Sequence, residues 1–367
     1  MLKSLIIFLT IVITIPTPAT DHGIYFQTHK NINGNIETIK STVKQLIEKA
    51  GFTILADLDV AVPDLVRENP KEHSGYKAKL LVFTSDEYVK QLTSFGNKYV
   101  VAGFLRVGLY ETADGIQIVI ADPETINRII FNDLWENDKI EEYSKIAMKS
   151  KTLKSKIVST IHKFDGGVKV EEPKSPIRDE EDLRESSRDM FMMVGPMTFF
   201  TDEDQFPMIY SRTNKDGKKG LANFKKEVLA NIKNFKPTAE DVEYRYTSSP
   251  EILKWRVVSE IYSPDSTAIL LGLTRSRTEA LSFHIAGASR EEDDLLTPGI
   301  DHVCAYPIEV LIMNLDKQLK VYTPREMFRM DMYFWDAGMA AFMDHMSMPS
   351  ILDESIKRAL LGKEYKD

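Results

Sequence analysis

The sequence of 367 residues contains a single cysteine, Cys304. No intrachain disulfide can form, so the fold must be stabilised by its hydrophobic core. Hydrophobic residues make up 43% of the chain and charged residues 28%, which is typical of folded globular proteins and excludes a disordered or fibrous one. A chain of this length predicts about two domains.

The chain has no excess of positive charge. Its 47 lysines and arginines are outnumbered by 55 aspartates and glutamates, which gives a formal net charge of -8. Proteins that bind nucleic acid present basic patches that replace counterions on the phosphates. We therefore predict no nucleic-acid partner.

Motifs of the common catalytic mechanisms are missing. The sequence has no Gly-x-Ser-x-Gly nucleophile elbow, no dinucleotide-binding or phosphate-binding glycine loop and no His-Glu-x-x-His pair. A thiol mechanism would need Cys304 with a histidine such as His302, and the sequence shows no third group to orient them. We expect a protein that is not an enzyme; a site assembled from residues distant in sequence stays open as an alternative, and the cofactor stays unknown.

The first twenty residues hold an apolar run from Leu5 to Ile15, preceded by Lys3. Prolines end the run, and Thr17 and Ala19 are the small residues expected before a cut after Ala19. This layout predicts a secretory signal peptide at 1–19, because the run is too short to span a bilayer comfortably. We expect an exported protein, periplasmic or extracellular, with no membrane span after cleavage. An uncleaved N-terminal anchor is the alternative.

Two stretches far apart in the sequence share one helical pattern. They are IETIKSTVKQLIEKAGF from position 36 and LANFKKEVLANIKNF from position 221. Each has apolar residues three or four positions apart, which predicts a helix with one buried face. The predicted faces are Ile36, Ile39, Val43 and Ile47 in the first helix, and Leu221, Phe224, Val228 and Ile232 in the second.

Further blocks repeat in the same order. AKLLVFTSDEYVKQL matches AILLGLTRSRTEALS, each a buried strand followed by a helix. RVGLYETADGIQIVIADPETI matches PIEVLIMNLDKQLKVYTPREM, each a hairpin and a helix, with turns predicted at 114–115 and 316–317 and with Pro324 in the place of Pro123. Repetition in a fixed order indicates a duplicated unit.

We therefore predict an α+β fold made of two tandem copies of one small unit, at 22–164 and 197–363. Each unit has an antiparallel or mixed sheet covered by helices, in the order edge strand, helix, two strands, helix, hairpin and two helices. The first strands are predicted at 23 and 196. Residues 165–196 are rich in glycine, proline and charge at their start, which predicts a surface linker.

The blocks EKAGFTIL, AKLLVF and GLYETADGIQIVIADPE resemble a domain family of unknown function, number 302. The resemblance covers nearly all of the first copy and, more weakly, the second. It implies a compact α+β fold and no particular activity. Many members carry a Pro-Cys pair before the hairpin, whereas this chain has GFLRV in the first copy and CAYPIEV in the second. Any role of that pair therefore does not carry over.

Methionines gather near the end of the chain, in and around MDHMSMP at 343–349. Thioethers with an imidazole suit Cu(I), so one interpretation is a soft-metal site made by Met343, His345, Met346 and Met348. In the first copy the matching stretch is SKIAMKS, which has apolar residues and no histidine. That comparison favours ordinary core packing.

A second methionine-rich run, MFMMVGPMTFF, follows position 189. Adaptable methionines are typical of surfaces that accept varied apolar partners, and seams between domains commonly hold ligands. Our leading interpretation is a binding or structural module. If it binds a ligand, we expect an apolar small molecule at the seam between the copies; the alternative is a hydrophobic interface there with no ligand. The residues expected there are Met192, Met193, Trp335, Met339 and Met343. The sequence does not indicate an oligomeric state.

Overall fold

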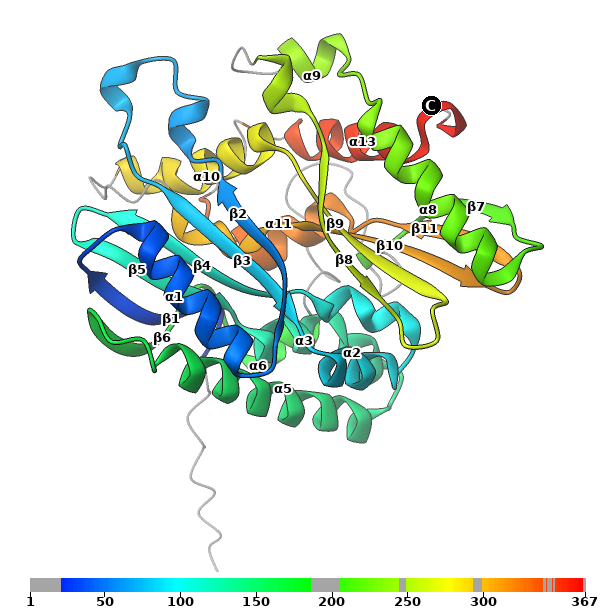
Figure 1. Cartoon of the computed structure of the whole chain (residues 1–367), viewed down its shortest axis with the longest axis horizontal. Helices are drawn as coiled ribbons and strands as arrows, with labels where there is room; N and C mark the ends of the chain where they lie inside the picture. Colours follow the sequence, from blue (N-terminus) through cyan, green and yellow to red (C-terminus); the bar gives the residue numbers. More distant parts are fainter. Residues whose placement is uncertain are drawn as a thin grey trace, which may run out of the picture.

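The computed structural model describes residues 21–185, 205–243, 249–292, 299–338, 341, 345 and 347–365 (Figure 1). The predicted signal peptide and the strand predicted at 196 lie outside the described residues. Among the described residues, no helix has the length and apolar character needed to cross a membrane.

The first sheet has six strands in the order β2-β3-β4-β5-β1-β6, with every neighbouring pair antiparallel. Its strands are β1 (His22–Ile32), β2 (Thr53–Val60), β3 (Ala78–Thr84), β4 (Leu105–Thr112), β5 (Gly115–Ala121) and β6 (Val168–Arg178). The helices of this unit are α1 (Ile36–Lys49), α2 (Asp86–Thr93), α3 (Pro123–Ile130), α4 (Asn132–Glu136), α5 (Ile140–Ile161) and α6 (Glu180–Glu185). Short 3₁₀ segments are η1 (Pro63–Leu65), η2 (Pro70–Glu72) and η3 (Asn97–Gly103).

The second sheet has five antiparallel strands in the order β7-β11-β10-β9-β8. They are β7 (Met208–Thr213), β8 (Arg256–Tyr262), β9 (Ala268–Thr274), β10 (Ile308–Leu315) and β11 (Gln318–Tyr322). The helices are α8 (Gly217–Lys233), α9 (Ala239–Glu243), α10 (Ser276–Glu292), α11 (Glu326–Phe334) and α13 (Met348–Leu361). The 3₁₀ segments are η4 (Pro250–Leu253), η5 (Ile300–Ala305) and η6 (Gly362–Glu364).

The two sheets have the same strand order. Strands β2, β3, β4, β5 and β1 take the places that β8, β9, β10, β11 and β7 take in the second sheet. The predicted α+β fold with two antiparallel sheet units is confirmed. Edge strands β2 and β8 adjoin, so the sheets lie next to each other (Figure 1). We call the contact between the two units the seam.

The first sheet has one strand that the second lacks. Strand β6 lies inside the stretch predicted as a linker and pairs with β1 along most of its length. Most of its side chains are exposed, so its composition resembles that of a loop although its backbone is hydrogen-bonded. The domain boundaries at 164 and 197 stay predictions.

The predicted faces of the two repeated helices are confirmed. The buried residues of α1 are Ile36, Ile39, Val43 and Ile47, and the large apolar ones of α8 are Leu221, Phe224, Val228 and Ile232. Helix α1 packs against β2, β3 and β4, and α8 packs against the corresponding β8 and β10 as well as β11. Both helices therefore close the same part of their unit's core.

The first hairpin turn differs from the prediction by one residue, whereas the second lies at 316–317 as predicted. The first turn is Ala113–Asp114, because Gly115 already pairs with Thr112. Pro123 is the first residue of α3, and Glu326 is the first residue of α11. The prediction that Pro324 takes the place of Pro123 is therefore wrong: β11 ends earlier than β5, and Pro324 lies in the connection between β11 and its helix.

The two units contact each other through their 3₁₀ segments. Segment η3 packs on β9 and β10, and η5 packs on β3, β4 and β5. A Cβ atom at Gly108 of β4 would lie 2.1 Å from Val303 Cγ1 and 2.9 Å from Cys304 Sγ, so only glycine lets η5 lie this close. The fourth residue of β10, in the place that Gly108 has in β4, is Leu311.

Candidate functional site

Three buried charged residues join the two units. Arg106 is the second residue of β4 and Glu309 is the second residue of β10, and the two form an ion pair. Arg329 of α11 donates to the other carboxylate oxygen of Glu309. Arg106 also donates to the Tyr333 hydroxyl at 3.2 Å and to the Pro307 carbonyl at 3.3 Å.

All three of these side chains are removed from water, with exposures of 2% for Arg106, 4% for Glu309 and 8% for Arg329. A buried ion pair gains little net stability over apolar packing, but it strongly disfavours arrangements that separate its charges. Neither of the two cavities described below is lined by these residues. We assign the cluster the role of fixing how the two units fit together.

His302 of η5 lies beside this cluster and is fully buried. Its Nε2 atom is 2.8 Å from a carboxylate oxygen of Asp336, and its Nδ1 atom is 3.2 Å from one of Asp301. Burial alone would lower the pKa of His302, but the two carboxylates outweigh it and raise the pKa to about 9. The imidazole stacks on Phe334 and meets Tyr25 edge to face, so the His302 cation is held between acids and aromatic rings.

Cys304 and His302 do not form a catalytic pair. The Cys304 thiol points to the Val119 carbonyl at 3.8 Å, and both ring nitrogens of His302 face carboxylates. Burial raises the pKa of Cys304 to about 12. The thiol therefore stays protonated at neutral pH, the form that is neither a good nucleophile nor a metal ligand.

A hollow of about 910 Å³ lies at the seam. The first unit lines it from η3, α3 and α4, and the second unit from residues 205–208, β10 and β11. Its apolar lining includes Val101, Ile130, Phe206, Leu311, Met313 and Leu315. This volume lies in the range of small-molecule sites.

Neighbouring strands β10 and β11 make the floor of the hollow. Met313 lies opposite Lys320, and Leu311 lies opposite Tyr322. Residues two apart in a strand point to the same face, so Leu311, Met313 and Leu315 form one apolar row. On the first sheet the place of Leu311 belongs to Gly108, and there η5 fills the space.

The first unit gives the hollow a polar wall. Asp133 of α4 accepts from the Lys98 ammonium at 2.5 Å and from the Tyr99 hydroxyl at 2.7 Å. The Tyr99 ring stacks on Phe131 with a centroid distance of 4.1 Å. Burial and Asp133 hold the pKa of Tyr99 well above its ordinary value. The phenol is therefore protonated at neutral pH and donates to Asp133.

Gln205 connects the second unit to this wall. Its amide donates to the Asn132 side chain at 3.0 Å and to the Ile129 carbonyl at 3.3 Å. Gln205 is buried, and the residues that follow it line the hollow. The polar contacts of Gln205 thus set where the apolar residues Phe206 and Met208 lie.

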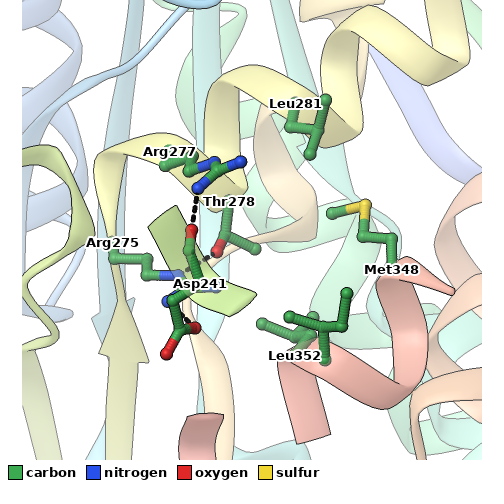
Figure 2. A pocket seen from close by; sticks show the side chains of 8 residues that line it. Asp241, Arg275, Arg277, Thr278, Leu281, Met348 and Leu352 are labelled. Carbon is green, nitrogen blue, oxygen red and sulfur yellow. Dashed lines mark hydrogen bonds and ion pairs between the residues drawn. The ribbon is translucent and has the colours of Figure 1, made fainter. Parts of the chain in front are cut away.

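A second cavity, of about 10 Å³, lies among buried arginines (Figure 2). Asp241 accepts from Arg275 at 3.2 Å and from Arg358 at 2.8 Å, and its backbone carbonyl accepts from Arg277. Burial lowers the pKa of Arg275 to about 10. Figure 2 shows Met348 across the cavity from the arginines. The space suffices for about one water molecule, so we read this cluster as an internal anchor for α9 and α13.

The predicted site residues are only partly described. Met192, Met193, Met339, Met343 and Met346 lie outside the described residues. Trp335 is 55% exposed and lies near the Arg178 guanidinium, 6.0 Å from its ring centre. His345 is buried, with Nδ1 at 2.8 Å from the Ala341 carbonyl. Within the described part of the chain, no group of three or more histidine, cysteine or acidic side chains could hold a metal ion.

Sequence reasoning missed the residues that shape the hollow. Lys98, Asp133 and Lys320 stand in unremarkable polar surroundings in the sequence. The charge pair at the seam had a signal, because Arg106 and Glu309 hold the same position in the two repeated strands. The repeated sequence blocks conceal it, because they align Arg106 with Pro307, two residues before Glu309.

Comparison with known proteins adds one structural likeness. No protein-family model matches the chain, and no curated protein matches it. Among solved structures, the chain is similar to an uncharacterized conserved protein, DUF302, from Bacillus stearothermophilus, with a TM-score of 0.29 and 7% identity. The similarity covers 38% of this chain and 96% of that chain.

We predict that, within the charge cluster, loss of the Glu309 carboxylate destabilises the fold more than loss of one arginine. Glu309→Gln leaves two buried guanidinium groups without their carboxylate and should lower the free energy of unfolding by roughly 3–5 kcal/mol. Arg106→Met leaves Glu309 paired with Arg329, so it should cost only about 1–2 kcal/mol. Urea unfolding of both variants measures the difference. Equal losses of unfolding free energy in the two variants would contradict this central role of Glu309.

We predict that His302 makes stability depend on alkaline pH. Its pKa rises from 6.5 to about 9 on folding, so its contribution is complete below about pH 6.5 and is lost as the pH rises through 9. The stability difference between wild type and His302→Asn should shrink by about 3 kcal/mol between about pH 6 and pH 10. Thermal or urea unfolding across pH checks this, with exposed His73→Asn as the matched control. A constant difference would contradict a protonated His302.

Proposed function

We propose that the protein is an exported binding module that holds a small molecule with an apolar body in the hollow at the seam. The observation that carries this is the hollow itself: about 910 Å³, with an apolar floor from one unit and a polar wall from the other. Ligand sites combine such apolar lining with a few fixed polar groups. The proposal includes export directed by the predicted signal peptide, and it assigns the protein no catalytic activity.

We infer further that the two units are tandem copies of one domain of the family number 302. Support comes from the shared strand order of the two sheets and from the matching buried faces of α1 and α8. In this proposal the ancestral unit has no hollow of its own. The hollow arises where one copy meets the other.

We predict that Leu315→Trp blocks the hollow. Leu315 is 40% exposed at one end of the apolar row, so a larger side chain fills the hollow without entering the core. The affinity for Nile red, an uncharged apolar dye, should fall at least about tenfold, with the folding stability unchanged. Fluorescence titration of the full mature chain measures this.

The matched control is Val168→Trp, which places the same ring at a comparably exposed position on β6, 50% against 40% for Leu315. It should leave dye binding unchanged. Equal losses in both variants, or no saturable binding to the wild type, would refute the hollow as a ligand site.

A second candidate function is Cu(I) binding, and a neighbour of His345 favours it. The imidazoles of His284 and His345 have centroids 6.5 Å apart. Burial, chiefly, lowers the pKa of His284 to about 4, so its imidazole is neutral at pH 7, the form that binds metals. The Nδ1 atom of His345 contacts the Ala341 carbonyl, an arrangement that orients metal-binding histidines.

The copper candidate predicts a change in Cu(I) uptake. A variant with His284→Ala and His345→Ala should bind Cu(I) at least about tenfold more weakly than wild type, measured by competition with bicinchoninate. His73→Ala, in an exposed loop, is the control. Uptake that is the same in all three proteins would eliminate this function.

A further inference from the structure

We propose that the ligand of the hollow is a straight-chain carboxylate whose head group binds Lys320 and whose chain lies along the apolar row of β10. This assignment rests on the proposed function and names its ligand class. It starts from Lys320, a lysine of β11 that lines the hollow and is only partly exposed.

The ammonium group of Lys320 is available to an anionic ligand. Among the described residues, no carboxylate lies within ion-pair distance of its ammonium group, whereas the hollow's other lysine, Lys98, is paired with Asp133 at 2.5 Å. The remaining acid of the lining, Glu136, has an interaction of its own. A half-buried ammonium group gains from a charged acceptor, and an anionic ligand would provide one.

The residues around Lys320 fit an extended hydrocarbon chain. Its cross-strand neighbour on β10 is Met313, with Leu311 and Leu315 two residues away on either side. The row from Leu311 to Leu315 spans about 13 Å, which a chain of roughly ten to twelve carbons covers. Met313 adapts its shape to flexible chains. The carboxylate head group and the hydrocarbon chain of the proposed ligand therefore have adjacent sites on β11 and β10.

The lining favours a carboxylate over a phosphate. A dianionic phosphate is usually bound by arginine forks or by several donors together. The described lining holds no arginine, and Lys320 is its only cation without an acidic partner. One ammonium group matches one negative charge.

Calorimetric titration of the full mature chain with dodecanoate and with dodecanol, below their aggregation limits, tests the assignment. Wild type should bind dodecanoate about tenfold more tightly than dodecanol, the worth of one charge-assisted contact. Lys320→Gln should remove that preference by weakening dodecanoate alone, and Lys320→Arg should retain it. Lys317→Gln, at the exposed hairpin turn, removes the same charge outside the hollow and should change nothing.

Equal affinities for the two probes, or a preference that survives Lys320→Gln, would overturn the carboxylate assignment while the hollow stays a binding site. Failure of both probes with Nile red still bound in a Leu315-dependent manner would also overturn only the assignment. If no probe and no dye binds, the proposed function fails as well.

Discussion

Everything at the seam depends on one buried carboxylate that serves two guanidinium groups. Glu309 accepts from Arg106 of the first unit and from Arg329 of its own unit, and all three are removed from water. Sliding one sheet along the other by two residues would replace this pairing with a charge against an apolar side chain. The cost of a buried, unpaired charge therefore fixes the register of the two units. The hollow keeps its shape because that register is fixed.

The same cluster shows why the two units differ in sequence at this place. Equivalent residues of two related units meet where Arg106 contacts Glu309, since each is the second residue of its strand. Two identical units would place like charges together there, which is unfavourable in a buried site. Opposite charges require different sequences, and the two units of this chain have them. The units differ a second time at this level: Gly108 of β4 lies against η5, whereas Leu311 of β10 lines the hollow.

Features that depend on residues close in the sequence could be predicted, and features that depend on residues far apart in the sequence could not. The buried faces of α1 and α8 follow from local periodicity, so the sequence was sufficient for them. Strand β6 escaped prediction because its exposed side chains carry no apolar alternation. The hollow escaped it altogether, because Lys98 and Lys320 come together only through the packing of the two units. Sequence periodicity therefore predicts the helices and strands, whereas the contacts at the seam can be read only from the three-dimensional structure.

The proposed ligand and the pairing of the two units would be coupled by thermodynamic linkage. Its floor belongs to β10 and β11 and its wall to η3 and α4, so a bound molecule contacts both units at once. A ligand that binds only the assembled form stabilises that assembly in proportion to its occupancy. Glu309 and Arg106 pair the two units without lining the hollow, whereas Asp133 and Gln205 form contacts in its wall. In the proposed function, the fit between the two units and the affinity for the ligand thus depend on one interface.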